Sequence, residues 1–212
     1  MSMVLDANWA TKWLTLCAQA MAANRVYLIE LDRAIGDSDH GENMDRGFQA
    51  VLEKLAETPP ETPGAALKLA AMALMSKVGG AAGPLYGTAF LRASTAVGDA
   101  LEVDPEAWAR ALTAARDGIV ARGKAEAGDK TMVDAWTPAA EAAQAAVARG
   151  TGNILEVLVA AAEAADAGAV ATDPLVARKG RASYLGERSA GHRDPGAASS
   201  ALILRAAVEA AA

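Results

Sequence analysis

The sequence predicts a single all-α domain, and three observations support this fold class. Hydrophobic residues make up 52% of the 212 residues, which is enough for a large buried core and argues against a disordered chain. Aromatic residues account for only 4% of an alanine-rich sequence. This composition favours closely packed helices over strands. About eight segments also space their apolar residues with a helical period, and none alternates convincingly as a strand does.

The first helix is expected to begin after Asp6 or Asn8, because both residue types are good N-caps. One face of this helix carries apolar residues at four-residue spacing: Trp9, Trp13, Cys17 and Met21. A continuation over residues 24–35 ends at Gly36, since glycine commonly terminates helices. Trp9, Trp13 and Cys17 are expected to pack in the core, as are Trp108 and Trp136 farther along the chain.

Seven more helices are expected after Gly36, and they follow one another without a linker that would divide the chain. Asp45 is placed in the first turn of the next helix, where a carboxylate suits the helix dipole. Pro105 suits a first helical position after Asp104, whereas Pro138 predicts either a kink or a later helix start. Residues 175–196 show little helical periodicity. The expected helices cover residues 44–57, 65–78, 83–101, 105–124, 131–150, 153–169 and 197–211.

Charge and composition exclude several classes of function. The net charge of −6 argues against a nucleic-acid partner bound through a broad basic surface. No apolar run approaches the roughly 18–20 residues of a membrane span, and the first residues lack a signal-peptide pattern. Cys17 is the one cysteine, so no internal disulfide can form. The sequence therefore predicts a cytoplasmic protein without a nucleic-acid or membrane partner.

The stretch "DRAIGDSDHGENMDRG", residues 32–47, concentrates carboxylates in an otherwise apolar chain. On a continuous helix Asp32 and Asp37 would point about 140° apart, and Asp37 and Asp39 about 200° apart. A helix end at Gly36 removes this obstacle, because an irregular loop can turn all three carboxylates inward. Clustered carboxylates repel one another unless a cation lies between them, so the stretch predicts a cation site. The alternative is a solvated acidic loop.

Oxygen ligands suit hard cations such as Mg²⁺, Mn²⁺ or Ca²⁺. The calcium-binding EF-hand pattern fails, because Gly41 stands where that loop, counted from Asp37, needs Asp or Asn. Zinc is disfavoured, since His40 and His192 are the only histidines and Cys17 is remote. Three carboxylates could hold two Mg²⁺ ions around a polyphosphate.

Three further segments are candidates for phosphate binding. The turn "GGAAGPLYGT" at 79–88 precedes a helix, whose free N–H groups would bind phosphate, although a tight interhelical turn explains it equally well. The near P-loop "GIVARGKA" at 118–125 is rejected, because Ala125 replaces the required hydroxyl and no strand precedes it. The segment 175–196 carries basic side chains that either neutralise phosphate charge or form a solvated loop: Arg178, Lys179, Arg181, Arg188 and Arg193.

Four blocks taken together resemble the nucleotide-binding L subunit of dihydroxyacetone kinase: "LDRAIGDSDHGENMDRGF", "GGAAGPLYGTAF", "GDKTMVDAW" and "ARKGRASYLGERSAGHRDPGA". They occur in the family's order and span nearly the whole chain. The resemblance implies one domain over residues 1–212, a barrel of eight antiparallel amphipathic helices. It also implies ADP or ATP and two Mg²⁺ ions at one end of this barrel.

The resemblance also implies roles for individual residues. Asp32, Asp37 and Asp39 correspond to the magnesium ligands of the family. Ala82 departs from the family's usual G-G-A-S-G, so a serine hydroxyl contact is lost there while a backbone contact remains. The residues that correspond to nucleotide contacts are His40, Gly41, Glu42, Asn43, Gly80, Ala81, Ala82, Gly123, Met132, Arg181, Asp194, Pro195 and Gly196.

The implied reaction transfers the γ-phosphoryl group of the nucleotide to dihydroxyacetone or another small ketose, with Arg181 as the catalytic basic residue. In the family, the ketose is bound covalently to a histidine of a separate K subunit. A chain of 212 residues has no room for that domain, so we expect it to be inactive alone. Two supply routes stay open: bound ADP rephosphorylated by a phosphohistidine-carrying phosphotransferase protein, or ATP that exchanges from solution.

Three alternative functions are kept. The related nucleotide domain of fatty-acid kinases typically reads D-x-D-T-G-T-N-M, whereas "DSDHGENM" here favours the ketose branch. A two-metal phosphohydrolase also uses clustered carboxylates, and it predicts turnover by the isolated chain. A regulatory module that only holds nucleotide predicts tight ADP binding without phosphoryl transfer.

Overall fold

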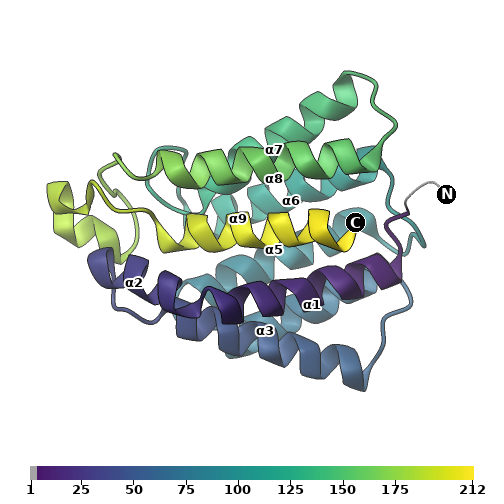
Figure 1. Ribbon diagram of the computed structural model, residues 1–212, viewed down its shortest axis with the longest axis horizontal. Helices are drawn as coiled ribbons and strands as arrows, with labels where there is room; N and C mark the ends of the chain where they lie inside the picture. Colours follow the sequence, from purple (N-terminus) through teal and green to yellow (C-terminus); the bar gives the residue numbers. More distant parts are fainter. Residues whose placement is uncertain (1–3) are drawn as a thin grey trace.

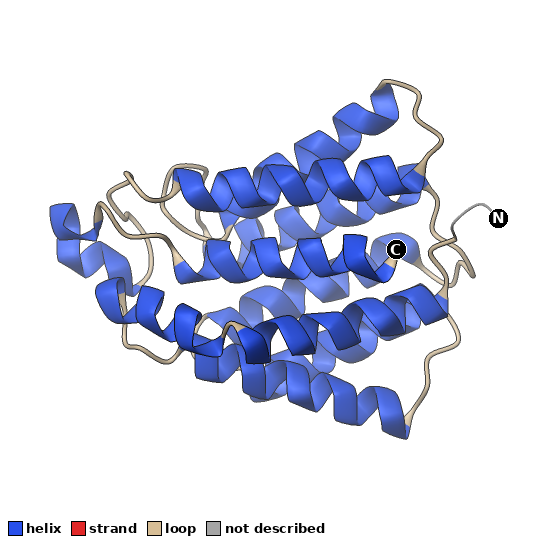
Figure 2. Ribbon diagram, viewed as in Figure 1, coloured by secondary structure: helices blue, strands red, loops and turns tan. Residues whose placement is uncertain are grey.

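The computed structural model describes residues 4–212, and these residues confirm the all-α prediction. They form no strand beyond one isolated bridge between Leu5 and Val103 (Figure 2). None of the described helices is long and apolar enough to cross a membrane. In chain order the helices are α1 (Ala7–Ala23), α2 (Arg25–Ile35), α3 (His40–Glu57), α4 (Pro63–Lys77), α5 (Ala82–Val97), α6 (Pro105–Gly123), α7 (Val133–Ala148), α8 (Ile154–Ala171), the 3₁₀ helix η1 (Arg181–Ser189) and α9 (Pro195–Ala210).

Eight of these helices form a closed ring. From α3 to α9, each α-helix packs against the next along the chain, and α1 packs against both α3 and α9. The helices lie roughly along one long axis, with α2 and η1 together at the left-hand end in Figure 1. This arrangement is consistent with the predicted barrel of eight helices. The ring brings the connections α2–α3, α4–α5, α6–α7 and α8–α9 together at that same end.

The core is built from aromatic side chains embedded in alanine. Trp9 stacks on Trp13 with ring centroids 5.2 Å apart, and Trp108 meets both rings edge-on. Trp136 and Cys17 are also buried, so the predicted core role of all four tryptophans and the cysteine is confirmed. The many small alanines on the other helix faces allow the backbones to approach closely, which leaves the few large rings to fill the centre.

The helix bounds differ from expectation at Asn24 and at the start of α3. The first helix is interrupted at Asn24, whose side-chain amide donates to the carbonyl of Ala20 at 2.9 Å. Such side-chain bonds compete with the helical ladder. Helix α3 begins at His40, four residues earlier than predicted. Asp45 therefore lies in the second turn rather than the first, and the predicted dipole role of its carboxylate is wrong.

Two further differences concern Pro138 and the segment before α9. Helix α7 begins at Val133, so Pro138 lies inside the helix. Of the two alternatives predicted for Pro138, a kink or a later helix start, the later start is wrong. A Cβ at Gly168 of α8 would lie 2.2 Å from the carbonyl oxygen of Asp134, so glycine lets α8 approach α7 beside this proline. In the segment 175–196, which was expected to lack helical structure, residues 181–189 form η1, broken by a positive φ of 54° at Gly186.

Candidate functional site

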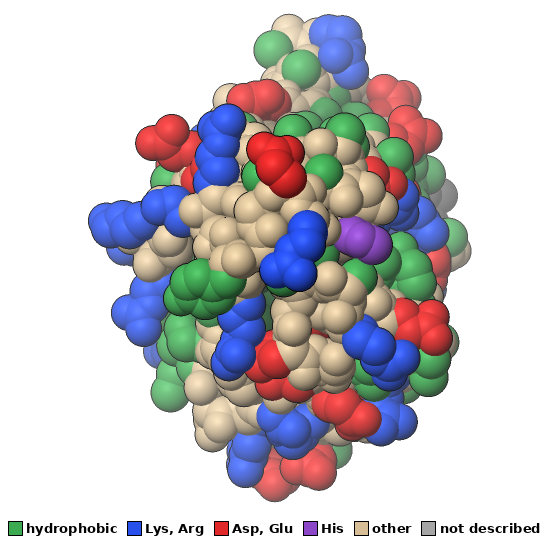
Figure 3. All heavy atoms as spheres, turned by 90° about the vertical axis from the view of Figure 1, so that its left-hand side faces the viewer, with side chains coloured by type: hydrophobic (Ala, Val, Ile, Leu, Met, Phe, Trp, Pro, Cys, Tyr) green, Lys and Arg blue, Asp and Glu red, His purple; other side chains and the backbone are tan. Residues whose placement is uncertain are grey.

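An open cavity lies where the four connections meet, at the end of the ring that carries η1. Figure 3 shows this face, over which basic side chains are spread among acidic ones. The cavity is lined by residues from the ends of α2, α3, α5, η1 and α9 and from the connections between helices, including α6–α7: Asp32, Ile35, Gly36, Asp37, Asp39, His40, Asn43, Gly79, Gly80, Ala81, Ala82, Leu85, Lys130, Thr131, Met132, Lys179, Gly180, Arg181, Ala182, Asp194, Pro195 and Gly196.

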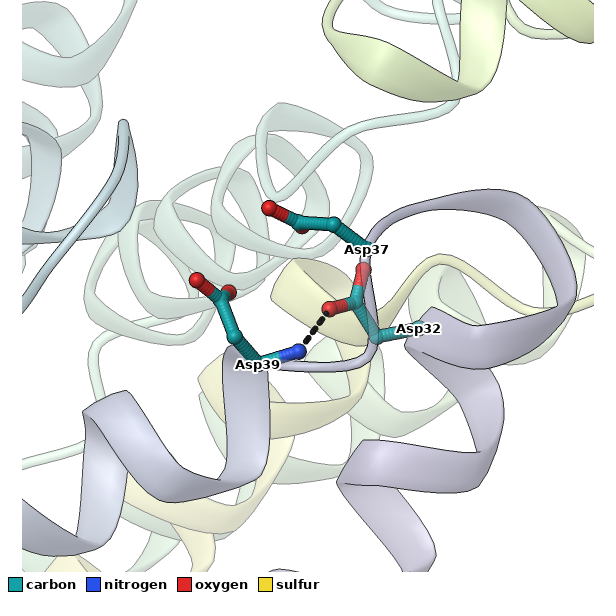
Figure 4. A group of neighbouring side chains, drawn as sticks. All are labelled: Asp32, Asp37 and Asp39. Carbon is teal, nitrogen blue, oxygen red and sulfur yellow. Dashed lines mark hydrogen bonds between the residues drawn. The ribbon is translucent and has the colours of Figure 1, made fainter.

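The three aspartates predicted as metal ligands converge on one wall of this cavity. One carboxylate oxygen from each of Asp32, Asp37 and Asp39 lies within 4.8 Å of the others. Asp32 is buried at the end of α2, whereas the other two are exposed in the α2–α3 loop (Figure 4). Three carboxylate oxygens at this separation match the donor set that Mg²⁺ prefers, so the residues present fit a hard divalent cation.

The loop between α2 and α3 owes its shape to Asp32. One oxygen of its carboxylate accepts hydrogen bonds from the backbone N–H groups of Asp39 and His40, at 2.8 and 3.0 Å. These are free N–H groups at the start of α3, so Asp32 caps this helix from outside it. A Cβ at Gly36 would lie 2.0 Å from the second carboxylate oxygen. Ser38 adopts a left-handed φ of 67°, which completes the turn between Asp37 and Asp39.

His40 faces the cavity and is tied to α5 and α9 behind it. Its Nε2 is 2.8 Å from the hydroxyl of Ser199, which is 2.6 Å from the hydroxyl of Tyr86. Burial lowers the pKa of His40 to about 4, although the carboxylates of Asp32, Asp39 and Asp37 oppose this shift. The imidazole is therefore neutral at pH 7, and its position is set by a hydrogen-bond chain that reaches into the core.

Asn43 and the turn at residues 79–82 form the next part of the wall. The carbonyl oxygen of the Asn43 side chain accepts a hydrogen bond from Arg46, so its amide N–H₂ group is left to donate to a ligand. A Cβ at Gly79 would lie 2.8 Å from that same oxygen. Gly80 has a positive φ of 63°, which favours glycine. The turn leads into α5, whose first N–H groups have no helical partner.

Arg181 reaches the aspartate cluster from η1. Its guanidinium lies 3.1 Å from the carboxylate of Asp37, and its side chain is 69% exposed. A pair this exposed adds little stability. The contact therefore indicates the reach of Arg181, which extends to anything bound at Asp37.

The start of α9 closes the opposite wall. Asp194 caps this helix by accepting a 2.8 Å hydrogen bond from the N–H of Ala197. Burial raises the pKa of Asp194 to about 7, with the carboxylates of Asp134 and Asp32 adding to the shift and Lys130 opposing it. Pro195 and Gly196 form the first turn of α9, and the carbonyl of Gly196 accepts from the Tyr86 hydroxyl at 2.8 Å. The cavity thus lies between two helix N-termini, a geometry that favours anions.

Three residues implied as nucleotide contacts lie outside the cavity lining. Gly41 packs against α2, where a Cβ would lie 2.2 Å from the carbonyl of Arg25. Glu42 is exposed and pairs with Arg25, and Gly123 is the exposed last residue of α6. The other implied residues all line the cavity, so the structure brings together Asp32, Asp37, Asp39, His40, Asn43, Gly80, Ala81, Ala82, Met132, Arg181, Asp194, Pro195 and Gly196.

Sequence reasoning missed Lys130. This lysine lies in the α6–α7 connection, is 1% exposed and has a left-handed φ of 62°. The block "GDKTMVDAW" included it, but an isolated lysine in a polar loop reads as solvated surface charge. Gly36 was noticed only as a helix breaker and Gly79 only as part of a glycine-rich turn, because their close contacts with Asp32 and Asn43 are not visible in the sequence.

Comparison with known proteins identifies the family of the chain. Residues 34–209 match the DAK2 domain. The chain is 45% identical over 197 residues to the PEP-dependent dihydroxyacetone kinase ADP-binding subunit DhaL of Escherichia coli, covering 93% of each chain. It is 43% identical over 207 residues to the corresponding subunit of kinase 1 of Listeria innocua, covering 98% of each.

Among solved structures, the dihydroxyacetone kinase of C. freundii in complex with AMP-PNP and Mg²⁺ is similar, with a TM-score of 0.67 and 25% identity. The match covers 94% of this chain but 33% of that one, so the chain spans about a third of the longer kinase. The family match extends over most of the chain, and the two subunits are similar along nearly their whole length. The chain belongs to the DAK2 domain family.

Proposed function

We propose that the chain is the nucleotide-binding subunit of a dihydroxyacetone kinase and binds ADP or ATP with two Mg²⁺ ions in the cavity. The observation that carries this proposal is the convergence of Asp32, Asp37 and Asp39 within 4.8 Å, in a cavity bounded by the N-termini of α5 and α9. Carboxylates on one wall and helix N-termini on the others suit a metal-bound polyphosphate. The names of the subunits from E. coli and Listeria innocua, which specify ADP binding, support the same assignment.

Each part of the cavity has a role in this proposal. Asp32, Asp37 and Asp39 would hold the metal, and Mg²⁺ offsets the charge of the β- and γ-phosphates during phosphoryl transfer. The N–H groups at residues 80–82 and the N–H of Gly196 would bind phosphate or ribose oxygens. Pro195 has no N–H, and the N–H of Asp194 donates to Thr172. Neutral His40 and the amide of Asn43 would donate hydrogen bonds to the nucleotide. Gly41, Glu42 and Gly123 are predicted contacts that lie just outside the lining.

Arg181 is proposed as the catalytic residue. Its guanidinium already reaches Asp37, so it can also reach a phosphoryl group held beside that carboxylate. Planar guanidinium groups bind phosphate oxygens through paired hydrogen bonds. Negative charge shifts between oxygens in the transition state, and the guanidinium of Arg181 would stabilise that charge.

The acceptor is proposed to be dihydroxyacetone or a related small ketose held on a separate K subunit. We favour the route in which resident ADP is rephosphorylated by a phosphohistidine-carrying phosphotransferase protein. Four relatives that this chain matches over at least 93% of both lengths are named PEP- or PTS-dependent kinase subunits. The triokinase and erythrulose kinase relatives are longer, and the chain spans about a third of each. The cytoplasmic location expected from the sequence forms part of the same proposal.

A transfer assay tests this proposal. The purified chain is incubated with Mg²⁺, dihydroxyacetone and a labelled phosphoryl donor, either ATP or a phosphohistidine-carrying phosphotransferase protein. Each reaction is run with and without a purified K subunit, and labelled ketose phosphate and inorganic phosphate are measured. We expect ketose phosphate only when the K subunit is present. Release of inorganic phosphate by the chain alone would instead identify a phosphohydrolase, and nucleotide binding without transfer to any acceptor would identify a regulatory module.

A further inference from the structure

We propose that Lys130 is a positioning residue for the loop that carries Arg181, and that it does not bind phosphate itself. Its ammonium joins the two ends of this loop, residues 172–173 and 191–194, which are called the neck below. This loop, residues 173–193, is called the site loop below. The inference rests on the proposed function only where it concerns nucleotide affinity, because the closure of the site loop is a property of the nucleotide-free protein.

The contacts of the Lys130 ammonium carry the first step. Its Nζ is 2.5 Å from the carbonyl oxygen of Thr172 and 3.3 Å from that of Asp173, and it also donates to the carbonyl of His192. A lysine ammonium has three N–H donors and no acceptor. All three donors are therefore used by backbone carbonyls: one just before the site loop, one at its first residue and one near its end. None remains for a phosphate oxygen, although Lys130 lines the cavity.

The neck of the site loop is closed by further bonds that meet at the same place. The guanidinium of Arg193 forms a bidentate ion pair with the carboxylate of Asp173, with N···O distances of 3.0 and 2.9 Å. The N–H of Gly191 donates to the carbonyl of Asp173 at 2.7 Å, and the N–H of Asp194 donates to the hydroxyl of Thr172 at 3.0 Å. These contacts join the two chain segments of the neck to each other. Lys130 differs from these neck residues because it belongs to the α6–α7 connection. Its hydrogen bonds therefore attach the closed neck to another part of the barrel.

The body of the site loop has a separate attachment, which shows what the neck must hold. Ala177 and Ala182 pack with Ile35, the last residue of α2, in a small cluster apart from the main core. The N–H of Arg178 donates to the carbonyl of Asp129 at 3.1 Å, next to Lys130. A cluster of this size buries little apolar surface. The neck is therefore needed to hold Arg181 beside Asp37 and to keep residues 194–196 at the cavity wall.

The backbone of Lys130 supports a specific role. A left-handed φ is costly for a residue with a Cβ and persists where surrounding contacts enforce it. Lys124, in the same connection, also has a left-handed φ, of 54°, but its side chain is exposed. Burial lowers the pKa of Lys130, and Asp194, Asp173 and Asp134 oppose the shift. The protein thus buries a cation among carbonyls at a strained position next to two cavity residues, Thr131 and Met132.

The test compares K130M with K124M, which makes the same change at the other left-handed lysine. Hydrogen exchange of the site loop is measured by mass spectrometry without nucleotide, and Mg-ADP affinity is measured by calorimetry well below the unfolding temperature of each variant. For K130M we expect faster exchange at Gly191 and Asp194 and about tenfold or greater loss of ADP affinity. For K124M we expect wild-type values.

Two results would overturn the proposal: unchanged exchange of the site loop in K130M, or faster exchange with unchanged ADP affinity. Failure of wild-type protein to bind nucleotide would instead refute the proposed function, and the exchange data would still decide whether Lys130 closes the neck. If K130M does not fold, the wild-type ammonium is observed directly by ¹⁵N NMR. Lys130 is the one buried lysine among the described residues, so a single protected ammonium signal is expected without ADP. A large shift of that signal on adding ADP would show direct phosphate contact and contradict the proposal.

Discussion

The backbone N–H of Asp39 donates a 2.8 Å hydrogen bond to the carboxylate of Asp32, so one proposed metal ligand fixes the position of another. The same carboxylate accepts from His40 and thereby begins α3. Asp32 has two oxygens, and the two N–H groups share one of them. The other oxygen is free to bind a cation, so helix capping and cation binding are compatible at this residue.

Gly36→Ala should damage the proposed metal site. A Cβ at this position would lie 2.0 Å from the free oxygen of Asp32, so the carboxylate must move and the cap of α3 is weakened. We expect a loss of about 1 kcal/mol in the free energy of unfolding and weaker Mg-ADP binding, measured by denaturant titration and calorimetry. Gly152→Ala is the control, because a Cβ at Gly152 meets no atom within 4 Å. Equal behaviour of the two variants would refute the requirement for glycine at position 36.

Arg181→Ala should slow phosphoryl transfer by about a hundredfold or more, the typical cost of removing one group that stabilises transition-state charge. The exposed side chain adds little to stability, so the unfolding temperature should stay within error. Steady-state kinetics with a purified K subunit provide the measurement. Arg188→Ala removes another exposed arginine from η1 and should retain activity; if both variants are equally fast, Arg181 has no catalytic role.

Tyr86→Phe should destabilise the protein by about 0.5–1.5 kcal/mol, because it removes buried hydrogen bonds, although Ser199, Ser200 and the carbonyl of Gly196 keep other partners. The Tyr86 hydroxyl joins Ser199, Ser200 and the carbonyl of Gly196. Chemical denaturation measures the effect, and Tyr27→Phe, whose hydroxyl makes a 3.4 Å contact with Arg193 near the surface, serves as the control. A loss in Tyr86→Phe no larger than in Tyr27→Phe would show that the buried network contributes little.

Asp194 should make the stability of the metal-free, nucleotide-free protein depend on pH. Its pKa is about 7 in the folded state, above the ordinary value of 3.8, so the folded state binds this proton more tightly than the unfolded state. Its favourable contribution is complete below about pH 4 and is lost as the pH rises to about 7. Asp194→Asn should therefore gain stability relative to wild type across this range.

Asp104→Asn is the matched control for this pH effect. Asp104 also precedes a proline and caps a helix, α6, but it is exposed. The stability of each variant relative to wild type is measured by denaturant titration at pH 4, 5.5, 7 and 8. A difference for Asp194→Asn that does not change with pH would contradict the assignment.

The fold class, the core tryptophans and most helix bounds were predictable because they depend on local composition and periodicity. The approach of Asp32, Asp37 and Asp39 was also predictable, since a helix break at Gly36 was visible in the sequence. The start of α3 was not, because its cap comes from Asp32, seven residues before Asp39. Lys130 escaped notice for the same reason: its partners Thr172 and His192 lie far along the chain, and only the closed ring brings them together.

Calorimetric titration of Mg-ADP into wild-type protein and Asp37→Asn tests the central claim most directly. Asp99→Asn, which changes an exposed aspartate just beyond the C-terminal end of α5, is titrated as the control, and circular dichroism establishes that all three proteins are folded. We predict that wild type and Asp99→Asn bind Mg-ADP alike, and that Asp37→Asn binds at least about tenfold more weakly, because a ligand to the metal is lost. Unchanged affinity in Asp37→Asn would contradict the assignment of the aspartate cluster as the metal site.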